Sequence, residues 1–114
     1  MQAWVDYFER LAEHNAARAR ARRTLLSLLN AKQRESLEQG LGFDVRVNNH
    51  LYRIRPGNTV QRLDPSGSFP LATLCVQPFS EKGEWLPEDD VALLQKLLLE
   101  ADEEAFLAVA IRGR

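Results

Sequence analysis

The stretch FDVRVNNHLYRIRPG, residues 43–57, decides the fold because it predicts a β-hairpin with a defined register. Apolar and polar residues alternate along it, which is typical of strands with one buried face. Asn48 and Asn49 suit a two-residue type I′ turn, since asparagine tolerates the positive φ angles that this turn requires. The stretch therefore predicts two antiparallel strands joined at Asn48-Asn49.

The turn also predicts which residues face each other across the hairpin. Three cross-strand pairs follow from it: Val45 with Tyr52, Phe43 with Ile54, and Asp44 with Arg53. Because side chains alternate between faces, the first two pairs lie on the core side. Asp44 and Arg53 lie on the other side, and we expect Arg53 to be engaged by Asp44 and Arg46 and Arg55 to be exposed.

Two further turns extend the hairpin into a meander over residues 43–76. Pro56-Gly57 is one turn, and residues 64–67 (DPSG) fit a type I turn with Asp first and Gly fourth. Strands are expected near residues 58–63 and 69–76. Val60 and Leu63 have opposite parity, so both are expected to reach the core only through a β-bulge.

The N-terminal segment, residues 1–24, predicts a helix whose apolar stripe is interrupted. Trp4, Phe8 and Leu11 follow helical spacing, with Tyr7 beside them. On a continuous helix the same face then carries Asn15, Arg18 and Arg22 before it becomes apolar again at Leu25. Either the helix bends near His14–Asn15 or its first half projects beyond the core, and we favour a projecting arm.

A second, short helix is expected over residues 31–39. Asn30 and Gln33 form a capping-box pattern at its start, and Gly40 is a typical residue just past a helix end.

The C-terminal part, residues 87–111, predicts two more helices after a loop over residues 77–86. Pro87 suits a first helical turn, and the acidic run 88–90 favours a helix N-terminus. The apolar stripe expected on the first of these helices comprises Val91, Leu94, Leu97, Leu98 and Ala101, widened by Leu93 and Leu99. Asp102 is expected to cap a final helix that carries Phe106, Leu107, Val109 and Ile111.

These elements predict one α+β domain spanning residues 1–114. It comprises N-terminal helices, a three- or four-stranded antiparallel β-meander, and C-terminal helices packed on one face of the sheet. A length of 114 residues and a hydrophobic fraction of 45% are ordinary for a single folded core.

Charge is divided unevenly between the two halves of the chain. Residues 1–63 hold 11 Lys and Arg against 6 Asp and Glu, whereas residues 64–114 hold 4 against 10. The two halves either attract each other within the fold or present a basic face to an anionic partner. One cysteine, Cys75, fits a reducing compartment, and with no signal peptide or membrane span in view we expect a cytoplasmic protein.

Residues for catalysis are scattered. His14, His50 and Cys75 share no local spacing, and the carboxylate runs near residues 88–90 and 100–104 suit helix ends. A Cys75–His50 pair across the sheet is the one nucleophile arrangement to consider. We expect no catalytic residue, no cofactor and no metal ligand, and therefore no enzyme.

Two surfaces remain as candidates for binding. The possible protein interface comprises Trp4, Tyr7, Phe8, Leu11, Leu93 and Leu99. The possible contacts to an anionic partner comprise Arg18, Arg22, Arg46, Arg55 and Arg62, with Arg62 adjacent to the other sheet arginines. Proteins that bind single strands add aromatic rings to such a face, but the rings of Phe43 and Tyr52 are expected on the core side.

A resemblance to known proteins is carried by three stretches of the sequence, LYRIRPG, LCVQP and LPEDDVALLQKLLLEADEEAFL. The pair LD and a glycine lie between the first two stretches. Across residues 25–109 the chain resembles a set of short, functionally uncharacterised bacterial and phage proteins. The resemblance implies no activity and no site residue. It favours a small accessory protein over a metabolic enzyme.

The leading hypothesis is a small non-catalytic interaction or adaptor protein that contacts a protein partner or a second copy of itself. The first alternative is a nucleic-acid-binding accessory module that uses the basic half. A small enzyme of unknown class is the third hypothesis.

Overall fold

The hairpin at residues 43–54 has the register that the sequence predicts. Strand β1 (Phe43–Val47) pairs antiparallel with β2 (His50–Ile54), and the partners are Phe43 with Ile54, Asp44 with Arg53 and Val45 with Tyr52. Asn48 and Asn49 have φ angles of 50° and 67°, as a type I′ turn requires. The computed structural model describes residues 2–57, 60–75 and 86–112.

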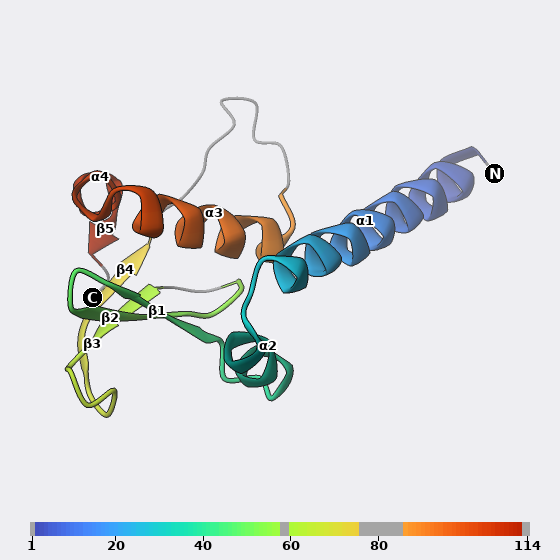
Figure 1. Ribbon diagram of the computed structural model, residues 1–114. Coiled ribbons are helices and arrows are strands. Elements are labelled where there is room, and N and C mark those ends of the chain that lie inside the picture. The colour runs from blue at the N-terminus through green and yellow to red at the C-terminus, as the bar shows by residue number, and fades with distance from the viewer. Residues whose placement is uncertain (1, 58–59, 76–85, 113–114) are drawn as a thin grey trace.

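Within the described residues, the chain forms an antiparallel meander preceded and followed by helices, so the α+β prediction is confirmed (Figure 1). The sheet order is β1-β2-β3-β4-β5. The remaining elements are α1 (Gln2–Ser27), α2 (Ala31–Glu38), β3 (Val60–Leu63), β4 (Pro70–Cys75), α3 (Glu88–Ala101), α4 (Glu103–Val109) and β5 (Ile111–Arg112). The loop predicted over residues 77–86 lies, except for Leu86, outside the described residues.

The sheet contains the predicted β-bulge in β3, but the bulge does not bring Val60 and Leu63 to the same face. The pairing of β3 with β4 shifts between Arg62 and Leu63. Val60 pairs with Ile54 on the core side, whereas Leu63 pairs with Leu51 on the opposite side. Both are buried, yet Leu63 does not join Val60 in the main core. The prediction that both reach the same core was wrong, because the opposite face has a small apolar contact of its own.

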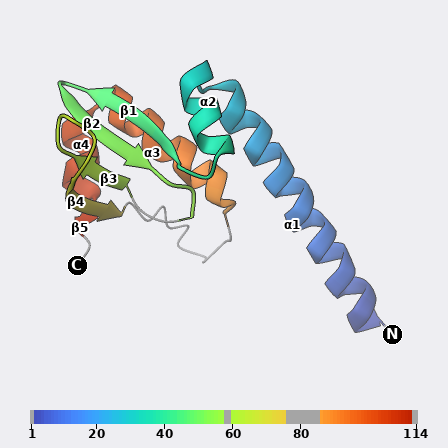
Figure 2. The ribbon, with the colours of Figure 1, turned by 90° about the horizontal axis from the view of Figure 1, so that it is seen from below.

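Helix α1 is continuous for 26 residues and projects away from the sheet (Figures 1 and 2). Its buried residues are Ala21 and Leu25, both in its last two turns. Residues 2–20 therefore form the projecting arm, and the alternative of a bend at His14–Asn15 was wrong. We call these residues the α1 arm.

The short helix α2 begins and ends as the sequence predicts. Asn30 Oδ1 accepts from Gln33 N at 2.8 Å, while Gln33 Oε1 accepts from Asn30 N at 3.0 Å. Gly40 follows the helix with a φ of 78°. These contacts complete a capping box, so the local sequence alone specifies this helix.

Helices α3 and α4 cover the core face of the sheet, and α3 contacts both β1 and β2 (Figure 1). The apolar stripe predicted for α3 was wrong in its centre, because Leu94 and Leu97 are exposed. The face that packs instead contains Ala92, Gln95, Lys96 and Leu99. The small side chain of Ala92 lets α3 approach its neighbours closely. Because α3 has more leucines than one face can hold, some of them lie on the exposed face.

The end of the chain differs from the prediction in one element. Asp102 caps α4 by accepting from Ala105 N at 3.1 Å, as expected. The helix ends at Val109, and Ile111 lies in the two-residue strand β5, which pairs with β4. The expectation of a helical Ile111 was therefore wrong.

The core lies between this helical layer and the sheet. Its fully buried large side chains are Tyr52, Phe43, Phe106, Leu25, Ile54, Leu99 and Val60. The core includes the four hairpin residues that the alternation predicts to face it, namely Phe43, Val45, Tyr52 and Ile54.

Candidate functional site

The tip of the α1 arm carries an aromatic cluster that its own domain does not cover. Trp4 is 66% exposed, Phe8 is 59% exposed and Tyr7 is 57% exposed. The rings contact each other, with centroids 6.4 Å apart between Trp4 and Phe8 and 5.6 Å apart between Tyr7 and Phe8. With Val5 and Leu11 also exposed, the tip presents a contiguous apolar surface.

The same face of the helix changes character toward the base of the arm. Positions three and four residues apart lie on one face of a helix, so the stripe through Trp4, Phe8 and Leu11 continues to Asn15 and Arg18. Arg18 Nη1 donates to Asn15 Oδ1 at 3.5 Å. The stripe is therefore aromatic at the tip and polar, then cationic, at the base.

The opposite face of the α1 arm is acidic. Asp6, Glu9 and Glu13 lie roughly half a turn away from Trp4 and Leu11 at 3.6 residues per turn. Arg10 donates from Nε to the Asp6 carbonyl at 3.4 Å. This face is a solvated surface that offers a natural control for the apolar one.

The base of the arm is held by packing and by an ion pair between Arg22 and Asp89. Leu25 and Leu29 belong to the core, and Arg22 Nε lies 2.8 Å from Asp89 Oδ2 on α3. Asp89 is buried, so its charge needs this partner. Arg22, predicted as a contact to an anionic partner, is thus engaged within the chain.

A hollow of about 400 Å³ lies where this stripe meets α3. Its lining residues are Arg18, Ala19, Arg22, Pro87, Glu88 and Asp89. It combines the proline ring at the start of α3 with two guanidinium groups and two carboxylates, and Arg22 and Asp89 among these form an ion pair. The α1 arm thus has exposed rings at one end and, at the other, a hollow to which Arg18 contributes a guanidinium group.

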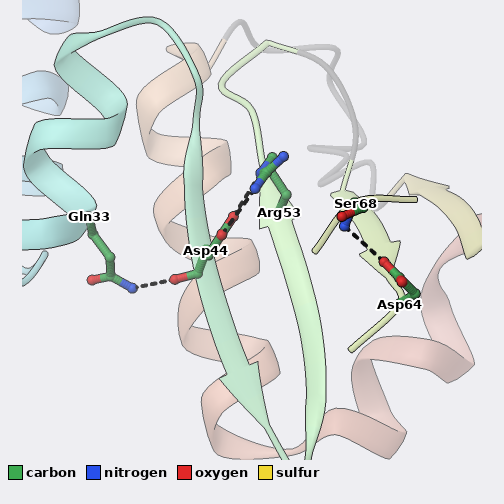
Figure 3. Close-up of polar contacts among 5 residues, drawn as sticks. All are labelled: Gln33, Asp44, Arg53, Asp64 and Ser68. Carbon is green, nitrogen blue, oxygen red and sulfur yellow. Dashed lines mark hydrogen bonds and ion pairs between the residues drawn. The ribbon is translucent and has the colours of Figure 1, made fainter. Parts of the chain in front are cut away.

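The arginine face of the hairpin is confirmed in part. Arg46 and Arg55 are exposed, and Arg53 donates to both carboxylate oxygens of Asp44, at 2.8 Å and 3.2 Å (Figure 3). The bond to Asp44 raises the pKa of Arg53. Gln33 Nε2 donates to the Asp44 carbonyl at 2.7 Å and so ties α2 to this edge strand.

Arg62 does not belong to this face. The register places it opposite Tyr52, so it lies on the core side of the sheet, and the prediction that it adjoins the other arginines was wrong. The cause is the register of β3. Leu63 pairs with Leu51 on the face opposite the core, so the preceding residue, Arg62, lies on the core side.

A second hollow, of about 410 Å³, adjoins Arg46 and Arg53. It lies between α2, the hairpin and the turn at residues 64–67, where Asp64 Oδ1 accepts from Ser68 N at 2.9 Å (Figure 3). No aromatic residue is among the described residues that line it. The described lining of this hollow has charge but lacks the stacking rings of single-strand binders.

A buried polar cluster that the sequence did not predict joins the hairpin to α4. Glu103 Oε2 accepts from the Tyr52 hydroxyl at 2.5 Å and lies 2.7 Å from His50 Nδ1, while Asn48 Nδ2 donates to Oε1 at 3.3 Å. Tyr52 is fully buried and Glu103 nearly so. The one available signal was the Tyr52 hydroxyl, because a tyrosine on a core face needs a hydrogen-bond partner.

The environment shifts the pKa of both acids in this cluster. Burial raises the pKa of Tyr52, as do its hydrogen bond to Glu103 and the negative charge there, while Arg62 acts in the opposite direction. Burial alone would raise the pKa of Glu103, but the hydrogen bonds from Tyr52, His50 and Asn48 and the charge of His50 lower it overall. The carboxylate is thereby held ionised, and its acceptor oxygens are occupied by the chain itself.

The leucines predicted as a second interface lie elsewhere than expected. Leu99 is fully buried and Leu93 is packed against the core, so neither forms an outward surface. Leu94 and Leu97 occupy the outward face of α3 instead, at 45% and 48% exposure.

The residues considered for catalysis do not come together. Cys75 ends β4 beside the Val60–Leu74 pair, whereas His50 begins β2 next to the Leu51–Leu63 pair, so the two stand at opposite ends of the sheet. Within residues 2–57, 60–75 and 86–112, no three His, Cys, Asp or Glu side chains are grouped as metal ligands.

Among the described residues, none of the helices is both long and apolar enough to span a bilayer. A comparison of the chain with protein-family models, curated proteins and solved structures finds no match.

Proposed function

We propose that this protein is a small, non-catalytic interaction module that binds another protein chain through the apolar face of its α1 arm. The observation that carries the proposal is the exposed aromatic tip, where Trp4, Tyr7 and Phe8 are all more than half exposed. Contiguous apolar surface of this kind marks interaction sites in soluble proteins.

The energetics support a binding role for the tip. Burial of each large side chain is worth about 1.5–3 kcal/mol, so the cluster of three rings and Leu11 gives a partner a strong driving force. Tyrosine and tryptophan are also the residues enriched at interface hot spots. The described core does not include these rings, because burial in α1 begins at Ala21.

The contacts that attach the base of α1 to the domain support the same role. The capping box of α2, the Arg22–Asp89 pair and the packing of Leu25 fix the base of α1 to the domain. A continuous helix then carries the aromatic tip about 25 Å or more from that base, at 1.5 Å per residue. Such a rigid mount suits a helix that packs against another helix or enters a groove.

The cytoplasm is the compartment that we propose for this function, on the basis of a single cysteine. A nucleic-acid-binding module remains the second candidate, supported by the exposed Arg46 and Arg55. It is less favoured because the described lining of the adjacent hollow has no ring for a base to stack on.

The test compares two double variants of the full chain in pull-downs and light scattering. Trp4→Ser with Phe8→Ser removes the aromatic tip, and we expect it to abolish both self-association and capture of any partner. The matched control, Glu9→Ser with Glu13→Ser, changes the acidic face of the same helix and should leave binding within about twofold of wild type.

Each pull-down is run with and without nuclease. Loss of capture only after nuclease treatment would contradict the proposal in favour of nucleic acid, as would equal binding by the two double variants. Circular dichroism confirms that both variants keep the helical content of wild type, so a lost interaction is not a lost fold.

A further inference from the structure

We infer that the partner of the α1 arm is a second copy of this chain and that the two arms pair antiparallel, each aromatic tip docking in the hollow at the base of the other arm. This inference rests on the proposed function, which assigns binding to the arm, and it adds the identity of the partner and its orientation. Homodimers with two-fold symmetry use the same surface on both copies, as this arrangement does.

The first argument is the change of character along one helix face. The face carries Trp4 and Phe8 at the tip and Arg18 toward the base, at helical spacing. A guanidinium group over an indole or phenyl ring is a favourable cation–π contact. Antiparallel pairing brings the rings of each copy to the cation of the other.

The parallel alternative is unfavourable for the same residues. It would place Arg18 against Arg18 of the partner subunit and Asn15 against Asn15 of the partner subunit in the middle of the seam. Like charges that meet in a desolvated contact repel each other. The same parallel pair would leave no cation beside the tryptophan.

The second argument is a match in length. The α1 arm, residues 2–20, spans about 28 Å at 1.5 Å per residue. When two such arms overlap fully, the two-fold axis passes near Leu11, which is itself exposed and apolar. In that register Trp4 comes level with Arg18 of the partner subunit.

The third argument is that a hollow lies at that level. The hollow of about 400 Å³ is lined by Arg18, Ala19 and Arg22 from α1 and by the start of α3. Its volume falls in the range of about 300–1,000 Å³ that accepts small-molecule ligands, so it has room for an indole ring. Pro87 supplies an apolar wall for a ring, and Arg18 supplies the cation, since Arg22 pairs with Asp89 in the same lining.

Cross-linking of the full chain tests the orientation. In a Cys75→Ser background, Val5→Cys and Ala19→Cys each introduce one thiol on the arm while Trp4 and Arg18 remain. In the register that sets Trp4 level with Arg18 of the partner subunit, residue 5 of one copy lies within about two residues, or about 3 Å along the helix axis, of residue 19 of the other. We expect a disulfide-linked dimer in the mixture of the two variants, formed at least tenfold faster than in either variant alone.

Two results would overturn the inference. If Val5→Cys cross-links to itself as fast as the mixture does, the pairing is parallel. If light scattering of the wild-type chain gives a monomer at high micromolar concentration, the partner is not a second copy. In the second result, a partner that is captured by wild type and lost with Trp4→Ser and Phe8→Ser would leave the proposed function standing.

A second measurement does not depend on the introduced cysteines. In the chain with its native Cys75, Trp4→Ala should weaken the dimer at least tenfold, and Arg18→Gln should weaken it about threefold to tenfold by removal of the cation. Glu13→Gln, on the acidic face, should leave the dissociation constant unchanged. Equal effects of Arg18→Gln and Glu13→Gln would contradict a ring-to-cation contact.

Discussion

The α1 arm and the core contain the same aromatic residue types in opposite environments. Tyr7 and Phe8 are 57% and 59% exposed on the arm, whereas Tyr52 and Phe106 are fully buried between α4 and the sheet. Tyr52 and Phe106 also contact each other edge to face, with centroids 6.2 Å apart. The difference is one of surroundings: the core rings are enclosed by several elements, whereas the described ring contacts of the arm lie within its own helix.

This comparison separates stability from association. The free energy gained by burial of the core rings belongs to folding, because sheet and helices enclose them in a single chain. The arm rings are exposed, so on the proposed function the corresponding free energy is gained in association. Substitutions in the two regions should therefore affect different measurements.

The largest effect is expected for a core ring. Phe106→Ala should lower the free energy of unfolding by about 3–5 kcal/mol, since it removes a fully buried side chain and leaves a cavity. Phe8→Ala, the matched change on the arm, should change the unfolding free energy of the monomer by less than about 0.5 kcal/mol. Urea unfolding of both variants at low protein concentration measures the two values. Equal losses in the two variants would show that the arm packs on its own domain.

The next effect is expected at the polar cluster that anchors α4. Glu103→Ala should cost about 2–3 kcal/mol, because it leaves the buried Tyr52 hydroxyl without an acceptor. Glu104→Ala, at the exposed neighbouring position, is the control and should cost less than about 0.5 kcal/mol. Thermal unfolding distinguishes them, and a similar melting temperature for both would contradict an anchoring role.

The same cluster predicts how stability depends on pH. The pKa of Glu103 is lowered in the folded chain, so its contribution is present above the unfolded pKa of about 4.3 and is lost as pH falls through the folded pKa. The pKa of Tyr52 is raised, so its contribution is present below the unfolded pKa of about 10 and is lost as pH rises toward the folded pKa. Wild type should therefore lose stability below about pH 4 and above about pH 10.

Tyr52→Phe isolates the alkaline part of this profile. The variant keeps the ring but has no ionisable hydroxyl, so the decline in its unfolding free energy above about pH 10 should be shallower than that of wild type. Tyr7→Phe, on the exposed arm, is the control. Parallel declines in Tyr52→Phe and wild type would mean that another group controls alkaline unfolding.

Local signals in the sequence were sufficient for the hairpin and the helix ends. The Asn48-Asn49 turn, the alternation in residues 43–54 and the capping box at Asn30 each depend on residues close in the chain, and the structure confirms them. The interruption at Arg18 likewise indicated a projecting arm. These features follow from φ preferences and periodicity, which a single sequence contains.

Features that depend on distant contacts were not predictable in the same way. Leu94 and Leu99 both look apolar, and which of them packs depends on where α1 and the sheet meet α3. Glu103 is one of several carboxylates near a helix start, and its selection as the partner of Tyr52 depends on the placement of α4 over the hairpin. The face of Arg62 depends on the pairing of β3, which no local turn specifies.

The smallest effect is expected on the arginine face of the sheet, where exposure resembles that of the arm but the residues are charged. Arg46→Ser with Arg55→Ser should change the unfolding free energy by no more than about 0.5 kcal/mol per site, since both side chains are exposed. Arg53→Ser should cost slightly more, up to about 1 kcal/mol, because it removes the partly exposed pair with Asp44.

If the face also binds an anionic partner, the Arg46 and Arg55 variant should bind that partner more weakly than wild type. This loss of affinity should become smaller as salt is added, because exposed charges are screened over about 10 Å at 0.1 M. Binding that is equal in wild type and this variant at low salt would assign the face to solvation alone and leave the aromatic arm as the binding surface.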